Sequence, residues 1–143
     1  CGEKTFGRET AATTKGFVME FIHAPKACAS VGPYSHCVKA GSTYYLCGQV
    51  PFHPVTGEVV GNGMKEQAVQ TLANMKAVLE AAGLAVTDIA KTTVFVTNMD
   101  DFAAFNEVYA AFMGEHRPAR VCVEVSNIAH GCLLEMDAIC FKE

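Results

Sequence analysis

The sequence lacks any apolar run near the ~18 residues that a membrane-spanning helix needs. It is also poor in charge, because only 18% of its residues are charged, and its formal net charge of −4 shows no basic excess. Proteins that bind nucleic acids usually carry such an excess. Half of the residues are apolar, which excludes a disordered chain. We therefore expect a folded protein that binds neither membranes nor nucleic acids.

A metal-binding or disulfide-bonded framework is also missing from the pattern. The seven cysteines are odd in number and form no C-x-x-C pair, and no cysteine–histidine cluster has metal-ligand spacing. The five histidines share no spacing. We interpret the cysteines as small buried apolar side chains in a reducing compartment, and we expect no metal site.

The length of 143 residues fits one domain. We interpret residues 1–18, which are polar, as a tail that is either a tag or a targeting remnant. Residues 19–143 then form a single domain. We expect a cytoplasmic protein, with a mitochondrial or other organelle location as the alternative.

Periodicity predicts two helices and several strands. Apolar residues recur at helical spacing over residues 64–83, where Gly83 is a natural stop, and over residues 101–115, where Gly114 ends the pattern. This order predicts an α+β fold with two helices on one face of a mixed sheet. Apolar residues occupy both odd and even positions of the strands, so both faces of the sheet are apolar. We expect copies of the same chain to bury the face that the helices leave uncovered. The expected strands lie at 21–25, 34–41, 42–52, 88–98, 117–125 and 132–142.

The stretch RPARVCVEV carries the candidate chemistry. We predict that residues 126–131 join this strand to the last one as a hairpin, with Cys122 opposite Glu135. Arg120, Cys122, Glu135 and Asp137 would then share the face that the helices leave open. An arginine fork can hold a carboxylate, and a glutamate can move a proton to or from water. A structural ion pair between subunits is the alternative.

Several segments together resemble the Rid family, also called YjgF and, in older usage, translation inhibitor or endoribonuclease L-PSP. The resemblance covers the chain from Phe21 onward, and its motifs are specific in this order although each one alone is weak. It implies a chorismate-mutase-like subunit and a homotrimer around a central β-barrel, with active sites between subunits and no cofactor. The segments are GPYSHCVKAG, YYLCGQVPFHPVTGEVV, TLANMKAVLEAAG, DIAKTTVFVTNMDDFAAFNEVY and RPARVCVEV.

The resemblance also implies an activity, the hydrolysis of 2-iminobutanoate and 2-iminopropanoate to 2-keto acids and ammonia. It assigns Arg120 as the carboxylate clamp and Glu135 as the group that activates water. The main chain of Cys122 would contact the imine nitrogen or the water, and Tyr34 would close the cleft. The remaining substrate-binding residues implied are Cys47, Gly48 and Asn106.

Other function classes stay open at this point. An endoribonuclease or translation inhibitor is disfavoured by the negative net charge and by the lack of a row of basic residues with aromatic residues between them. A non-catalytic sensor of small carboxylates or a holdase chaperone would use the same cleft or the apolar surface. Cys122 as a nucleophile lacks a neighbouring base. The expected partners are copies of the chain and small 2-imino and 2-keto carboxylates.

Overall fold

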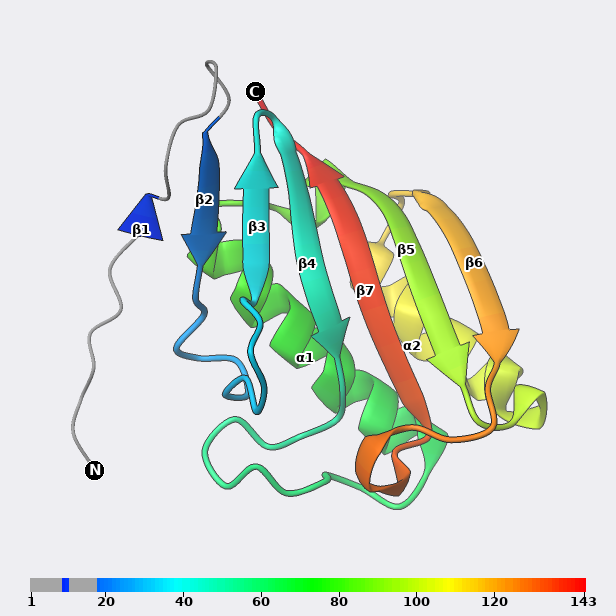
Figure 1. The fold of residues 1–143 in the computed structure, drawn as a ribbon. Coiled ribbons are helices and arrows are strands. Elements are labelled where there is room, and N and C mark those ends of the chain that lie inside the picture. Colours follow the sequence, from blue (N-terminus) through cyan, green and yellow to red (C-terminus); the bar gives the residue numbers. More distant parts are fainter. Residues whose placement is uncertain (1–8, 11–17) are drawn as a thin grey trace.

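In the computed structural model, which describes residues 9–10 and 18–143, two helices lie on one face of a mixed sheet (Figure 1). The helices α1 (Met64–Ala81) and α2 (Phe102–Met113) are both behind the sheet in this view, and the near face is open. The expected α+β architecture is therefore confirmed. Within the described ranges, no helix is long and apolar enough to cross a membrane.

The sheet has seven strands in the order β1-β2-β3-β4-β7-β5-β6. All neighbouring strands are antiparallel except β5 and β6, which are parallel. The polar tail was expected over residues 1–18. Only Glu9–Thr10 and Val18 of this tail belong to the described residues. The strands are β1 (Glu9–Thr10), β2 (Met19–Ile22), β3 (Cys37–Ala40), β4 (Thr43–Gln49), β5 (Ile89–Val96), β6 (Ala119–Glu124) and β7 (Leu134–Phe141).

The hairpin expected between the last two strands is wrong, because β5 lies between β6 and β7. The segment β5-α2-β6 is instead a strand–helix–strand unit. Parallel neighbours need a long crossover, usually a helix, and α2 is that crossover. The chain then passes the end of β5, where the Val125 N–H donates to the Val96 carbonyl (2.8 Å) and the Thr97 N–H donates to the Leu133 carbonyl (3.1 Å).

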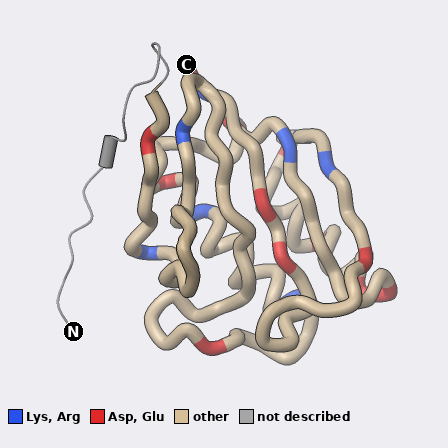
Figure 2. The backbone as a smooth tube through the Cα atoms, viewed as in Figure 1, with Lys and Arg blue, Asp and Glu red and all other residues tan. Residues whose placement is uncertain are grey.

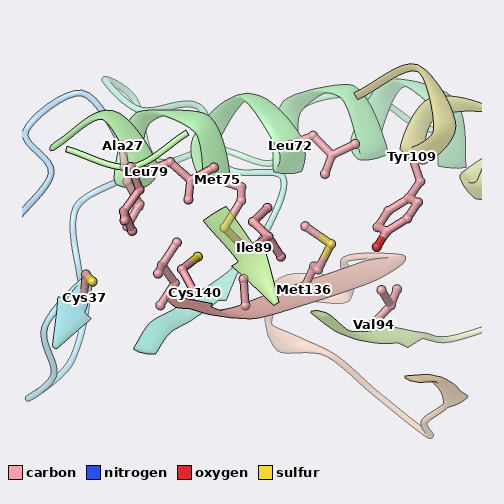
Figure 3. Close-up of a cluster of buried hydrophobic side chains, with 14 of the residues drawn as sticks. Ala27, Cys37, Leu72, Met75, Leu79, Ile89, Val94, Tyr109, Met136 and Cys140 are labelled. Carbon is pink, nitrogen blue, oxygen red and sulfur yellow. The ribbon is translucent and has the colours of Figure 1, made fainter. Parts of the chain in front are cut away.

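The main core lies between the sheet and the helices. Figure 3 shows Leu72, Met75 and Leu79 of α1 pointing toward Ile89 and Met136 of the sheet. These side chains are almost completely buried. Each such burial contributes about 1.5–3 kcal/mol.

Both helices end as their sequences predict. Gly83 and Gly114 adopt positive φ values of 73° and 61°, which glycine tolerates better than any other residue. Asn98 accepts a hydrogen bond from the Asp100 N–H (2.9 Å) in the short turn before α2. The start of α2 is fixed in this way next to the edge strand β6.

Candidate functional site

Two acidic side chains occupy the middle of the open face. Glu135 and Asp137 lie on β7 opposite Phe95 and Thr93 of β5, and Figure 2 shows the acidic segments of β7 there. Burial raises the pKa of the Glu135 carboxyl, and the negative charge of Asp137 raises it further. No described group donates a hydrogen bond to this carboxylate. Glu135 is thus a proton acceptor with raised affinity for a proton, the property expected of a general base.

A β-bulge in β4 lies directly beside Glu135. Leu46 lies opposite Ala138 and Gln49 opposite Met136, so the two residues between them, Cys47 and Gly48, face only one residue of β7. Such bulges redirect the backbone and are frequent next to active sites.

Gly48 gives the Glu135 side chain its space. A Cβ atom at Gly48 would lie 2.9 Å from Cδ and 3.2 Å from Cγ of Glu135. These distances are shorter than ordinary van der Waals contacts, so any larger residue at this position would displace the carboxylate.

A small cavity of about 30 Å³ adjoins this bulge, with Tyr34, Cys47, Gly48 and Gln49 in its wall. A cavity of this size can hold about two water molecules. Its wall is fixed by the buried His36 ring, whose Nδ1 accepts from the Ala24 N–H (3.0 Å). Nε2 of the ring therefore donates to the Cys28 carbonyl (2.8 Å).

The thiols predicted near the site are poor nucleophiles. Burial raises the pKa of Cys47 to about 11, although a hydrogen bond from Gln49 lowers it somewhat. Burial also raises the pKa of Cys122, against a smaller opposing effect of Arg120. Both thiols are therefore protonated at neutral pH, and covalent catalysis through Cys122 is disfavoured.

Arg120 and Cys122 lie on the face opposite to the one expected. In the β5–β6 register Arg120 is opposite Thr92 and Cys122 is opposite Val94, and both β5 residues are completely buried beneath the helices. The prediction that Arg120 and Cys122 share the open face with Glu135 is wrong. It assumed that β6 pairs with β7, and a shift of one residue in a register exchanges the two faces.

The Arg120 guanidinium rests on α2. It lies 5.2 Å from the Phe102 ring centroid and 4.8 Å from that of Tyr109, and its Nη1 donates to Oδ1 of Asn106 (2.7 Å). Such cation–π contacts hold an arginine while leaving its other N–H groups available. A cavity of about 480 Å³ opens here, with Asn106, Tyr109, Met113, Arg117, Pro118 and Arg120 in its wall.

The sequence pattern did not identify Phe102 and Tyr109 as partners of Arg120, because the apolar spacing over residues 101–115 was used only to predict a helix. Phe102, Asn106 and Tyr109 recur at spacings of four and three residues, which places them on one face of the helix. An asparagine within an aromatic stripe was the signal that this face contacts a polar group.

The candidate residues thus form two half-sites. The open-face half-site contains Glu135, Gly48, Cys47 and Tyr34, and the edge half-site contains Arg120, Asn106 and Cys122. Their strands, β7 and β6, are two strand spacings or about 10 Å apart, and the side chains lie on opposite faces. One half-site has a base without a cation, and the other has a cation without a base. In the described part of the chain, no group of three or more side chains could hold a metal ion.

Comparisons with known proteins agree on one group of relatives. A family model described as endoribonuclease L-PSP matches residues 23–142. A RutC family protein of Pyrococcus horikoshii is 48% identical over 124 residues, which cover 87% of this chain and 98% of that protein. A 2-iminobutanoate/2-iminopropanoate deaminase of Escherichia coli is 45% identical over 85% of this chain and 96% of that protein. The crystal structure of E. coli TdcF with bound serine has a TM-score of 0.81 and 41% identity, covering 86% of this chain and 98% of that one.

Proposed function

Because the chain belongs to the Rid/YjgF family of endoribonuclease L-PSP proteins, we propose that it hydrolyses small 2-imino acids to 2-keto acids and ammonia. The observation that carries this proposal is Glu135, a half-buried carboxylate with a raised pKa beside Gly48. The similar E. coli protein is named a 2-iminobutanoate/2-iminopropanoate deaminase, and we assign the same two substrates here. The serine bound to TdcF supports a ligand of that size.

The proposed chemistry needs one water molecule and no cofactor. Arg120 holds the substrate carboxylate with its free N–H groups, which fixes the imine carbon in place. Glu135 removes a proton from the water as the oxygen attacks that carbon. Attack on the N-protonated imine gives a neutral carbinolamine. Glu135 then returns the proton to the amine nitrogen, and ammonia leaves as the C–N bond breaks. Glu135 takes up the proton of the carbinolamine hydroxyl at the same time, which leaves the keto C=O. The main chain of Cys122 contacts the imine nitrogen or the water, and Tyr34 closes the cleft.

We further propose that a second copy of the chain completes the site, in a homotrimer around a central barrel of sheets. Large apolar side chains are exposed on the open face, with Tyr45 50% and Phe141 53% accessible, and Val121 and Val123 lie on the same face. Exposed apolar surface of this extent marks an interaction site. Burying it against another copy would bring the edge half-site of one chain to the open-face half-site of its neighbour.

A coupled assay tests the proposed activity. Threonine dehydratase generates 2-iminobutanoate, and semicarbazide traps whatever the protein does not convert to 2-ketobutanoate. We expect the wild type to divert the imine, and Arg120→Ala and Glu135→Gln each to lose about 10²–10⁴-fold of the activity.

Matched controls remove the same charges elsewhere, with Lys76→Ala and Glu80→Gln on the exposed side of α1. Both should keep full activity. A folded wild-type protein that diverts no imine would contradict the proposal. If that protein cleaved RNA instead, the endoribonuclease alternative would replace it.

A further inference from the structure

The cavity beside Arg120 contains a second arginine that the proposed reaction does not use. Arg117 precedes β6 and lines the same cavity of about 480 Å³. This volume falls within the range of about 300–1,000 Å³ found for ligand pockets. A substrate with a single carboxylate needs only one arginine fork, so the second cation calls for an explanation.

The cavity wall is strongly biased toward positive charge. Its polar groups are two guanidinium groups and the Asn106 amide, and no acidic residue is among the described residues that line it. The Tyr109 hydroxyl is paired with the buried Thr92 hydroxyl (2.8 Å). The nearby acidic residue of α2, Glu107, forms an ion pair with Lys65 at 2.8 Å on the protein surface. Neither arginine of the cavity is neutralised by a carboxylate of the described chain.

Both arginines are held in place by one nitrogen and keep the others for a ligand. Nη1 of Arg117 donates to the Gly114 carbonyl (2.6 Å) and to the His116 carbonyl (2.9 Å). Nη1 of Arg120 donates to Asn106. On each residue Nη2 and Nε have no partner among the described residues, which leaves an N–H pair that suits a carboxylate.

The two arginines are close neighbours in the chain and share one cavity. Three residues of extended chain span at most about 11 Å between the Cα atoms of Arg117 and Arg120. Both side chains line the same cavity, so one ligand inside it can contact both guanidinium groups.

We propose that this cavity binds dicarboxylates, with one carboxylate on Arg120 and the other on Arg117. The ligand class is 2-imino and 2-keto acids of about four or five carbons with a second terminal carboxylate. The proposal rests on the proposed function only for the 2-imino or 2-keto group. The alternative is that Arg117 merely caps the last carbonyls of α2.

The test compares two stable 2-keto acids of equal chain length by isothermal titration calorimetry. 2-Oxoglutarate carries the second carboxylate, and 2-oxopentanoate carries a methyl group instead. We expect wild-type protein to bind 2-oxoglutarate about fivefold or more tightly, as an additional charge-assisted contact at a partly exposed site would give.

Arg117→Gln keeps an N–H donor for the helix carbonyls but removes the charge. It should abolish the preference and leave the affinity for 2-oxopentanoate within about twofold, whereas Arg120→Ala should weaken binding of both ligands. Lys76→Ala removes a charge from α1 and should change neither affinity. Arg117→Lys is a second test in case the glutamine variant does not fold. It keeps the charge but not the planar guanidinium, so it should retain part of the preference for 2-oxoglutarate.

The proposal would be overturned if wild-type protein bound 2-oxoglutarate and 2-oxopentanoate with equal affinity. It would also be overturned if Arg117→Gln weakened the binding of both ligands equally. In either case Arg117 would be only a helix cap. Because binding is measured without turnover, the result is independent of the deaminase assay. A preference for 2-oxoglutarate without deaminase activity would contradict only the proposed function. Deaminase activity without the preference would contradict only the dicarboxylate site.

Discussion

At the scale of single residues, two effects disfavour the ionised form of the Glu135 carboxyl. Burial and, secondarily, Asp137 raise its pKa above the usual value of a glutamate. Its stabilising contribution is therefore fully present below the pKa of the unfolded chain and is lost as pH rises through the higher folded-state pKa. The ionised form needed for a general base thus costs stability at neutral pH, a trade that is common at functional sites.

Substitution of Asp137 tests this electrostatic arrangement. Asp137→Asn removes the neighbouring negative charge, so the pKa of Glu135 should fall while the effect of burial remains. Since the base must be ionised, the acidic limb of the profile of kcat/KM against pH should move to lower pH. Asp100→Asn, at an exposed position on the turn before α2, serves as the control and should leave the limb in place. An unmoved limb in Asp137→Asn would show that Glu135 is not the titrating group.

Substitution of Gly48 tests the position of the carboxylate. Gly48→Ala places a Cβ atom 2.9 Å from Cδ of Glu135, so the side chain must move. A displacement of about 1 Å can cost about 10²-fold in rate, and we expect kcat to fall by about 10–10²-fold in a folded protein. Gly63→Ala is the matched control, because nothing lies within 4 Å of its added Cβ atom. Wild-type kcat in Gly48→Ala would rule out the close approach as a requirement.

At the scale of elements, the helices could be predicted and the strand pairing could not. The apolar periodicity of residues 64–83 and 101–115 located α1 and α2 to within a few residues, because a helix is defined by local spacing. Pairing depends on contacts between distant segments. The sequence pattern contained a strand, a helix and a strand over 88–125, yet the parallel β5–β6 unit was missed in favour of a hairpin. That single error placed Arg120 on the wrong face.

Asn74 of α1 connects the helix to the segment after β4. It is buried, and its Nδ2 donates to the carbonyls of Val50 and Phe52, both at 2.9 Å. Asn74→Ala removes both hydrogen bonds and leaves the Phe52 carbonyl without this partner, whereas the Val50 carbonyl still accepts from the Phe52 N–H (2.8 Å). The free energy of unfolding, measured by urea denaturation, should therefore fall by about 1–3 kcal/mol. The exposed Asn62→Ala should change it by less than about 0.5 kcal/mol. Equal stability of the two variants would contradict this function of Asn74.

At the scale of the whole molecule, the open face explains why the strands carry apolar side chains on both faces of the sheet. The helices cover only one face, and the other presents Tyr45, Phe141, Val121 and Val123 together with the two β7 carboxylates. The sequence predicted such an uncovered face and named residues of both half-sites. It could not predict that one chain keeps the half-sites apart, because that separation follows from the sheet order.

The apolar open face predicts that self-association and activity fail together. Val123→Glu introduces a charge at a position that is already 41% exposed, so the fold of one chain should persist. We expect sedimentation velocity to show dissociation toward the monomer, with loss of imine hydrolysis. Val55→Glu is the control, since Val55 is 86% exposed in a loop outside the sheet. An associated and active Val123→Glu protein would refute this interface.

The most direct test mixes two inactive variants, Arg120→Ala and Glu135→Gln, after joint unfolding and refolding. If each site takes Arg120 from one chain and Glu135 from a neighbour, then random assembly restores a wild-type pair in about a quarter of the sites. We therefore expect the mixture to recover about 25% of wild-type imine hydrolysis, while each variant refolded alone stays inactive. A mixture as inactive as its components, although it assembles normally, would contradict a site shared between chains.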